Sequence, residues 1–175
     1  MIEDHWKRIA GMHVTEVGDV AVCWIAYDKQ TDTITLYECA MFRGQQPAVI
    51  AEGVNSRGRW IPLAFRREDK PMADMLRDRG ANTIEPLVEN DALAEVWSKE
   101  IKERMDTGRF KVVRRLSEWL DESKTYFRDD AMVPRDSHPL MTATRFAVMQ
   151  RKDWARALRP KGKAKQANYP KVAIV

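Results

Sequence analysis

Three strand-like runs follow one another near the N-terminus before any helical pattern begins. Residues 9–17, 20–27 and 33–42 are rich in β-branched and aromatic side chains, and the polar stretch DKQTDT separates the last two. Because so short a polar turn joins them, the second and third runs are predicted to form an antiparallel hairpin. The chain is therefore expected to begin with a β-meander.

The hydrophobic period changes after residue 42. Helices are predicted over residues 47–54, 70–79, 90–107, 116–127 and 140–158, and short strands over 60–65, 83–86 and 110–113. The helix over 90–107 is the most regular, with an apolar stripe at Leu93, Val96, Trp97, Ile101 and Met105. Strands that come first and then alternate with helices predict an α/β fold in which helices flank a sheet.

The composition is that of a globular protein, with 175 residues, 44% hydrophobic and 32% charged. The longest apolar run, residues 20–27, is too short to span a bilayer, and the N-terminus lacks the apolar core of a signal peptide. We therefore expect a cytoplasmic protein. Cys23 and Cys39 have no metal-finger or redox-motif spacing, so we expect buried, reduced thiols.

The net charge of +4 is unevenly distributed. Residues 150–175 hold eight Lys or Arg and one acid, a net charge of +7, so residues 1–149 carry −3. We expect a globular domain over residues 1–150 and a basic, flexible tail over residues 151–175.

Six sequence segments, in one order, resemble the nuclease domain of the large terminase subunit that packages DNA in tailed phages. They are DHWKRIAGM, AVCWIAYDKQTDTITLYE, GRWIPLAF, RDRGANTIEP, MDTGRFKVVRRLSEWLDE and LMTATRFAVM, and they fall within residues 4–149. The resemblance implies a phage-derived protein of the host cytoplasm with a ribonuclease H-like fold, a mixed sheet flanked by helices. It also implies a site in which carboxylates from the first strand, the central strand and the last helix hold two divalent cations that cut DNA.

The chain departs from that family where the acids are expected. Where the family has Gly, an apolar residue and Asp, this chain has Gly11, Met12 and His13, and a second family acid falls on Val17. Only Glu68 or the adjacent Asp69 can replace the acid that follows the central strand.

The family's paired aspartates before the last helix are replaced by His138 and Pro139. His13, Val17, Glu68, His138 and Pro139 are thus relics of catalytic positions. The nearest substitute acids, Glu16, Asp19 and Asp136, are displaced along the chain.

The resemblance therefore implies that two-metal cleavage is lost or severely reduced, because a neutral imidazole carries no negative charge and cannot bridge two cations. We expect no cofactor. Mg²⁺ or Mn²⁺ would be needed only by an alternative enzyme, a metal-dependent endonuclease that uses Glu16, Asp19, Glu68 and Asp136.

Several residues have both a structural and a functional interpretation. His13 is either a hydrogen-bonded strand histidine or one ligand of a single transition metal, together with Glu68, Asp136 and His138. Arg66 and Arg67 are either surface charges or phosphate-binding groups in a cleft with a positive field.

The basic tail is either a solvated extension or a non-specific DNA contact made by Arg151, Lys152, Arg156, Lys161, Lys163 and Lys165. The Walker A loop, G-x-x-x-x-G-K-[ST], does not occur in the sequence, so we expect no ATP-driven translocation by this chain. The leading hypothesis is a non-catalytic terminase nuclease homologue that binds DNA or a protein and regulates or inhibits packaging or a host defence component.

Overall fold

The fold is that of a mixed five-stranded sheet flanked by helices, and a computed structural model describes it for residues 2–127 and 133–159. The strands are β1 (Lys7–Val14), β2 (Val20–Asp28), β3 (Thr33–Phe42), β4 (Leu63–Phe65) and β5 (Phe110–Val112). Their order in the sheet is β4-β1-β2-β3-β5. The predicted meander is confirmed, because β1 pairs antiparallel with β2 and β2 pairs antiparallel with β3. The two outer strands, β4 and β5, run parallel to their neighbours.

Five α-helices and one 3₁₀ turn follow the meander in the described part of the chain. They are α1 (Pro47–Ser56), η1 (Arg67–Asp69), α2 (Lys70–Arg77), α3 (Asp91–Asp106), α4 (Ser117–Tyr126) and α5 (Pro139–Trp154). The predicted strand over residues 60–65 is shorter in the structure because Pro62, which has no amide to donate, stands before β4. The segment 83–86 forms only an isolated bridge between Thr83 and Leu63.

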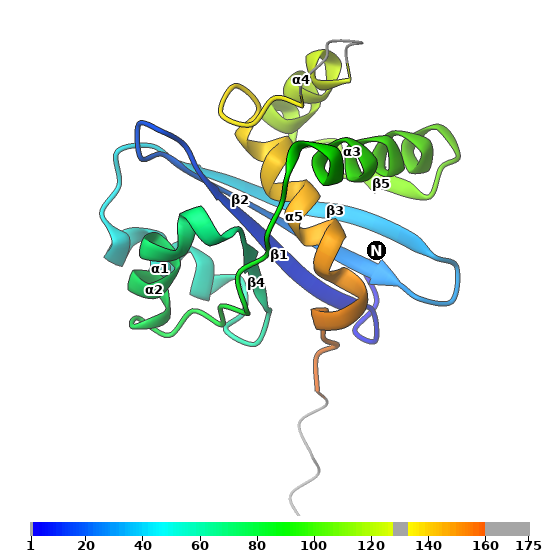
Figure 1. Ribbon diagram of the computed structural model, residues 1–175. Helices are drawn as coiled ribbons and strands as arrows, with labels where there is room; N and C mark the ends of the chain where they lie inside the picture. The colour runs from blue at the N-terminus through cyan, green and yellow to red at the C-terminus, as the bar shows by residue number, and fades with distance from the viewer. Residues whose placement is uncertain (1, 128–132, 160–175) are drawn as a thin grey trace, which may run out of the picture.

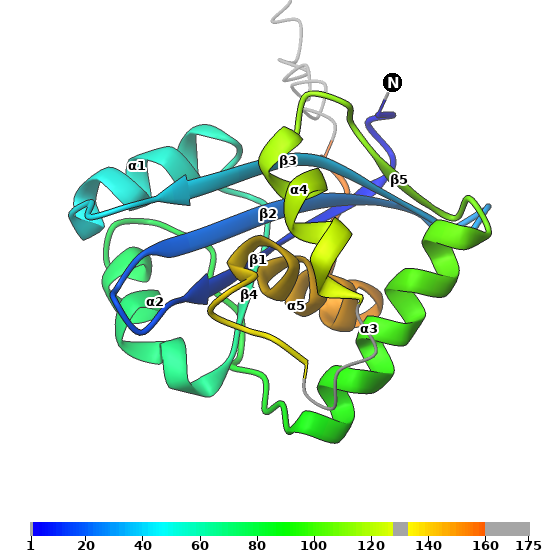
Figure 2. The same ribbon diagram turned by 90° about the horizontal axis from the view of Figure 1, so that it is seen from above.

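The helices form two groups, one for each apolar cluster of the core. One cluster lies among the sheet, α3, α4 and α5, and the other packs α1 and α2 against the sheet. Figure 1 shows these two groups set apart, and Figure 2 shows α5 running beside β1 with α3 on its outer side. Every residue of β2 is buried, as expected of a central strand covered on both faces.

α5 is the central helix, and glycine allows it to approach the sheet closely. A Cβ atom on Gly11 would lie 1.9 Å from the carbonyl oxygen of Ala143, so no larger residue fits there without moving the helix. α5 packs against both β1 and β2, and residues 140–148 are all buried. Gly11 thus fixes the helix directly over the strand that carries His13.

The globular part extends beyond the expected boundary at residue 150. α5 continues to Trp154, Arg151 is 1% exposed, and Arg156 forms a backbone bridge with Arg8 at the start of β1. The helix ends at Trp154 rather than near residue 158, and the backbone of Ala155 is already extended. Within the described residues, no helix combines the length and the apolarity that a membrane crossing requires.

Candidate functional site

The candidate site forms where β1 and β4 end next to each other and the segment before α5 crosses them. β4 runs parallel to β1 with Phe65 opposite Met12, so the residues that follow Phe65 lie beside His13 and Val14. The chain then turns through η1 and buries Asp69, whose carboxylate accepts a hydrogen bond from the Val14 amide at 3.3 Å.

His13 is completely buried between two carboxylates from distant parts of the chain. Its Nε2 lies 2.8 Å from Oδ1 of Asp136, and its Nδ1 lies 3.6 Å from Oδ2 of Asp69. An ionised carboxylate only accepts hydrogen bonds, so Nε2 must carry the proton that it donates to Asp136. The imidazole ring therefore occupies the space between the two acids, with its N–H directed at Asp136 and its Nδ1, which makes no hydrogen bond, toward Asp69.

Asp136 is held as an anion by its surroundings. Burial opposes ionisation, but hydrogen bonds from the Glu16 amide and from His13, with the positive charge of Arg66, keep the pKa of Asp136 below its usual value. The Glu16 amide lies 3.0 Å from Oδ2, and His13 occupies Oδ1. Both oxygens of this carboxylate are therefore engaged by the protein itself.

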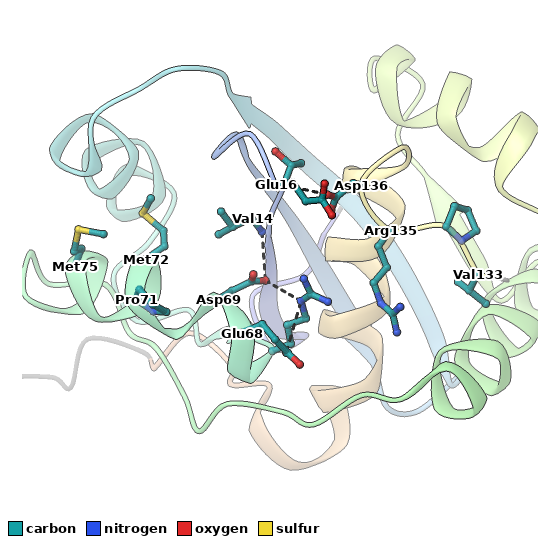
Figure 3. A pocket seen from close by; sticks show the side chains of 13 residues that line it. Val14, Glu16, Glu68, Asp69, Pro71, Met72, Met75, Val133, Arg135 and Asp136 are labelled. Atoms are coloured by element: carbon teal, nitrogen blue, oxygen red, sulfur yellow. Dashed lines mark hydrogen bonds and ion pairs between the residues drawn. The ribbon is translucent and has the colours of Figure 1, made fainter.

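A cleft of about 910 Å³ opens above this arrangement (Figure 3). Its charged lining consists of four carboxylates and two guanidinium groups, from Glu16, Glu68, Asp69, Asp136, Arg66 and Arg135. The structure thus differs from the expected positive cleft. Arg66 contributes little free positive charge, because its Nε lies 3.6 Å from Asp69 and 3.8 Å from Glu68.

The structure brings together only some of the residues singled out from the sequence. His13 meets Asp136, as the single-metal hypothesis requires, but the buried acid beside it is Asp69, whereas the side chain of Glu68 is 62% exposed. His138 is not among the residues lining the cleft, and it hydrogen-bonds Thr125 at 2.6 Å and Ser137 at 2.9 Å.

The remaining relic positions also lie outside the cleft lining. Val17 is 84% exposed in the turn between β1 and β2, and Pro139 is the first residue of α5. Asp19 lies in the same turn and accepts a hydrogen bond from the Gly44 amide. None of these three residues is placed to replace a missing metal ligand.

The expected DNA-binding residues divide into separate groups. Arg151 is buried and pairs with Glu100 at 2.9 Å, so it belongs to the core and not to a tail. Arg67, Lys152 and Arg156 are exposed. Lys161, Lys163 and Lys165 lie outside the described residues.

A buried charged pair, Arg145 and Glu89, lies next to the cleft and contacts its residue Arg135. No pattern in the sequence predicts this pair. Arg145 of α5 binds both oxygens of Glu89 at 2.7 Å, and both side chains are fully buried. Arg135 of the cleft also contacts Glu89, at 3.4 Å, and pairs with Asp91 at 3.0 Å. Residues separated by more than 40 positions form this pair, so no local spacing could have revealed it.

The residues present do not fit the two-metal centre that the family resemblance implies. Across residues 2–127 and 133–159, no group of three or more His, Cys, Asp or Glu side chains is arranged to hold a metal ion. The Nε2–H of His13 is directed at Asp136, and its Nδ1, which makes no hydrogen bond, lies toward Asp69, so an uncharged ring occupies the space between the acids where two cations would need negative charge.

The mixed sheet flanked by helices is ribonuclease H-like, the fold of terminase large-subunit nuclease domains. The nuclease domain of the phage P22 large terminase superposes with a TM-score of 0.79 and 21% identity, covering 90% of this chain and 87% of that one. The nuclease domain of the SPP1 large terminase (g2p), solved with bound Mn, has a TM-score of 0.69 and 14% identity, over 86% of this chain and 92% of that one. The phage G20c nuclease with bound cobalt has a TM-score of 0.63 and 14% identity, over 85% and 84%. At the level of sequence, the chain matches no family profile and no curated protein.

Proposed function

We propose that this chain is a terminase nuclease homologue that no longer cuts DNA and acts instead as a binding protein. The observation that carries the proposal is the position of His13. Its ring fills the space between Asp69 and Asp136 and donates a hydrogen bond to Asp136, so an imidazole stands between the two carboxylates in place of a cation.

The chemistry of two-metal cleavage explains why a histidine at position 13 would prevent the reaction. Two-metal cleavage needs several hard oxygen ligands that offset four positive charges. A histidine supplies no negative charge, and here its Nε2 lone pair is replaced by an N–H. Asp69 and Asp136 alone would leave two Mg²⁺ ions poorly neutralised.

The charges of the molecule favour different partners at different places. DNA phosphates are attracted by unpaired cations, whereas the cleft presents more carboxylates than guanidinium groups. Exposed cations occur at the far end of α5, at Lys152, Arg156 and Arg159. We therefore assign DNA contact to that end and, above all, to Lys161, Lys163 and Lys165, which follow it in the sequence. We assign the cleft to a protein segment.

A protein that keeps the nuclease fold but does not cleave DNA is suited to a regulatory role. A chain with the fold of a terminase nuclease domain can occupy the DNA or the protein surfaces that an active nuclease uses. It would then compete with packaging, or act on a host defence component that recognises the same surfaces.

One observation favours the alternative of a metal-dependent endonuclease. Asp69 and Asp136 approach the same imidazole from opposite sides, and Glu16 and Glu68 line the same cleft. If His13 swung away, these acids could gather around a cation. The two proposals therefore differ in whether the chain as it stands binds a divalent metal.

Electron paramagnetic resonance of Mn²⁺ tests this difference without relying on activity. The purified full chain is titrated with MnCl₂, and the signal of free Mn²⁺ is followed. The binding-protein proposal predicts that all added Mn²⁺ stays free at sub-millimolar concentrations. Stoichiometric loss of the free signal, abolished by Asp69→Asn, would establish the enzyme alternative.

A further inference from the structure

The floor of the cleft, formed by Glu16, Glu68, Asp69 and Asp136, keeps a net negative charge after its ion pairs with the surrounding cations are counted. Glu16 is exposed and makes no ion pair within the described residues, and Glu68 has only the distant Arg66 contact at 3.8 Å. Arg135 faces the same cleft, but its guanidinium already binds Glu89 and Asp91. The floor is therefore electrostatically suited to a cationic group.

Apolar walls flank this floor on both sides. α2 contributes Pro71, Met72 and Met75, and the segment before α5 contributes Val133 and Pro134 (Figure 3). Methionine side chains are unbranched and adapt to differently shaped ligands. The volume of the cleft, about 910 Å³, lies near the upper end of the range for small-ligand pockets and leaves room for a short stretch of extended peptide.

The chain itself contains a segment with the complementary chemistry. Residues 160–171, PKGKAKQANYPK, hold four lysines and no acid. Lys161, Lys163 and Lys165 are spaced two apart, so in an extended conformation all three ammonium groups would point to the same side. The alanines and the tyrosine between and after them would offer apolar contacts to the walls.

The segment is long enough to reach the cleft from the end of the described chain. Arg156 is bridged to Arg8, whereas the cleft lies at the Val14 end of the same strand, about 20 Å away at about 3.3 Å per residue. From Arg156 to Lys165 an extended chain spans up to about 30 Å. The chain leaves α5 at Trp154, whereas the cleft is lined by the segment that precedes Pro139 at the other end of the helix, so residues 160–171 would have to pass along the molecule to enter it.

We propose that the cleft is a docking surface for the chain's own basic segment, residues 160–171, with Lys161, Lys163 and Lys165 paired to Glu16 and Glu68. Docking sequesters the lysines that would otherwise contact DNA phosphates, so the segment is shared between the cleft and DNA. The inference goes beyond the proposed function, because it holds whether or not the chain cleaves DNA.

Zero-length crosslinking tests the contact directly on the full chain. A water-soluble carbodiimide activates a carboxylate, the Lys Nζ attacks it to form an amide, and a urea leaves, so only groups in ion-pair contact are joined. We expect crosslinks from Glu16 or Glu68 to Lys161, Lys163 or Lys165, in a product of monomer mass that disappears in 0.5 M NaCl. The pair Lys124–Asp121, 2.7 Å apart, serves as the internal positive control.

Two outcomes of that experiment overturn the proposal. One is the absence of any crosslink from the segment to the cleft while the Lys124–Asp121 crosslink is present. The other is a crosslink found only in dimers, which would place a second copy in the cleft.

Competition with DNA gives an independent second readout. In the full chain, Glu16→Gln with Glu68→Gln should release the segment and tighten duplex DNA binding about three- to tenfold, measured by fluorescence anisotropy. The matched control, Glu52→Gln with Asp121→Asn, removes the same charge elsewhere and should change affinity less than twofold. Equal tightening by both pairs would mean that only net charge matters, and the docking proposal would be wrong.

Discussion

The Nε2 of His13 lies 2.8 Å from Oδ1 of Asp136 although 123 positions separate the two residues in the chain. Asp69 lies on the other side of the ring, so the imidazole stands between two carboxylates from distant parts of the chain.

Replacing His13 with aspartate should make stability depend on metal. His13→Asp would put three carboxylates in mutual contact, so in EDTA we expect a lower Tm, and Mn²⁺ should raise the Tm by about 5 °C as it binds only the folded chain. Thermal unfolding with EDTA and with Mn²⁺ measures this. The control, His13→Asn, introduces a side chain of the size of aspartate without its charge, and its Tm should not respond to Mn²⁺. An equal response of the unmodified chain would contradict the account.

The buried Arg145–Glu89 pair should be essential for folding stability. Glu89→Ala leaves the Arg145 guanidinium buried without its main partner, which should cost about 3–5 kcal/mol of unfolding free energy. Urea denaturation gives the value, and the exposed Glu85→Ala should cost under about 0.5 kcal/mol. A cost below about 1 kcal/mol for Glu89→Ala would show that water replaces the lost partner.

Glu122 should make the protein less stable as pH rises toward neutrality. Burial raises the pKa of this carboxyl to about 7, although amides at the start of α5 donate to it. Because the folded pKa lies above the ordinary value, the stabilisation is complete below about pH 4.5 and is lost as pH rises through 7.

The variant Glu122→Gln isolates that effect. Between pH 5.5 and pH 8, the unmodified chain should lose about 1 kcal/mol more stability than the variant, a small value because part of the carboxyl reaches solvent. Thermal melts at both pH values give the comparison. Parallel pH profiles for the two proteins would rule out Glu122 as the source.

DNA affinity should depend mainly on the basic segment. Changing Lys161, Lys163 and Lys165 to Gln should weaken binding and reduce the slope of log K against log salt by about 2.7. The control changes Lys99, Lys102 and Lys124, which already pair with acids, to Gln and should leave the slope nearly unchanged. Equal losses in both variants would move DNA contact onto the helices. Truncation after residue 149 is unsuitable for this test, because it would remove the buried Arg151 and Ala155.

The meander and most helices could be predicted from the sequence because their signals are local. The run Thr33–Phe42 is rich in β-branched and aromatic residues, and the stripe from Leu93 to Met105 has helical spacing. The stripe was wrong about which face is buried, because Val96 is exposed and the buried residues of α3 are Ala94, Ser98, Ile101 and Arg104. The short strand β4 was harder to delimit, since Pro62 cuts the apolar run that precedes it.

The site itself was only partly predictable from sequence. The sequence alone shows that position 13 is a histidine and not an aspartate. It does not show which of the adjacent acids, Glu68 or Asp69, lies beside His13. η1 turns Asp69 inward and Glu68 outward, and that turn depends on packing against β1. Likewise, the ion pairs of Arg66 explain why the cleft is not positive, and they join side chains whose directions a sequence does not reveal.

The most direct test of the central claim is a plasmid-cleavage assay. Supercoiled plasmid is incubated with the purified full chain and with Mg²⁺ or Mn²⁺, and the fractions of nicked and linear DNA are followed by gel electrophoresis. Because His13 occupies the position between Asp69 and Asp136, we predict that the plasmid stays supercoiled with either ion. Nicked or linear product that EDTA abolishes, and that is lost in both Asp69→Asn and Asp136→Asn, would contradict the account.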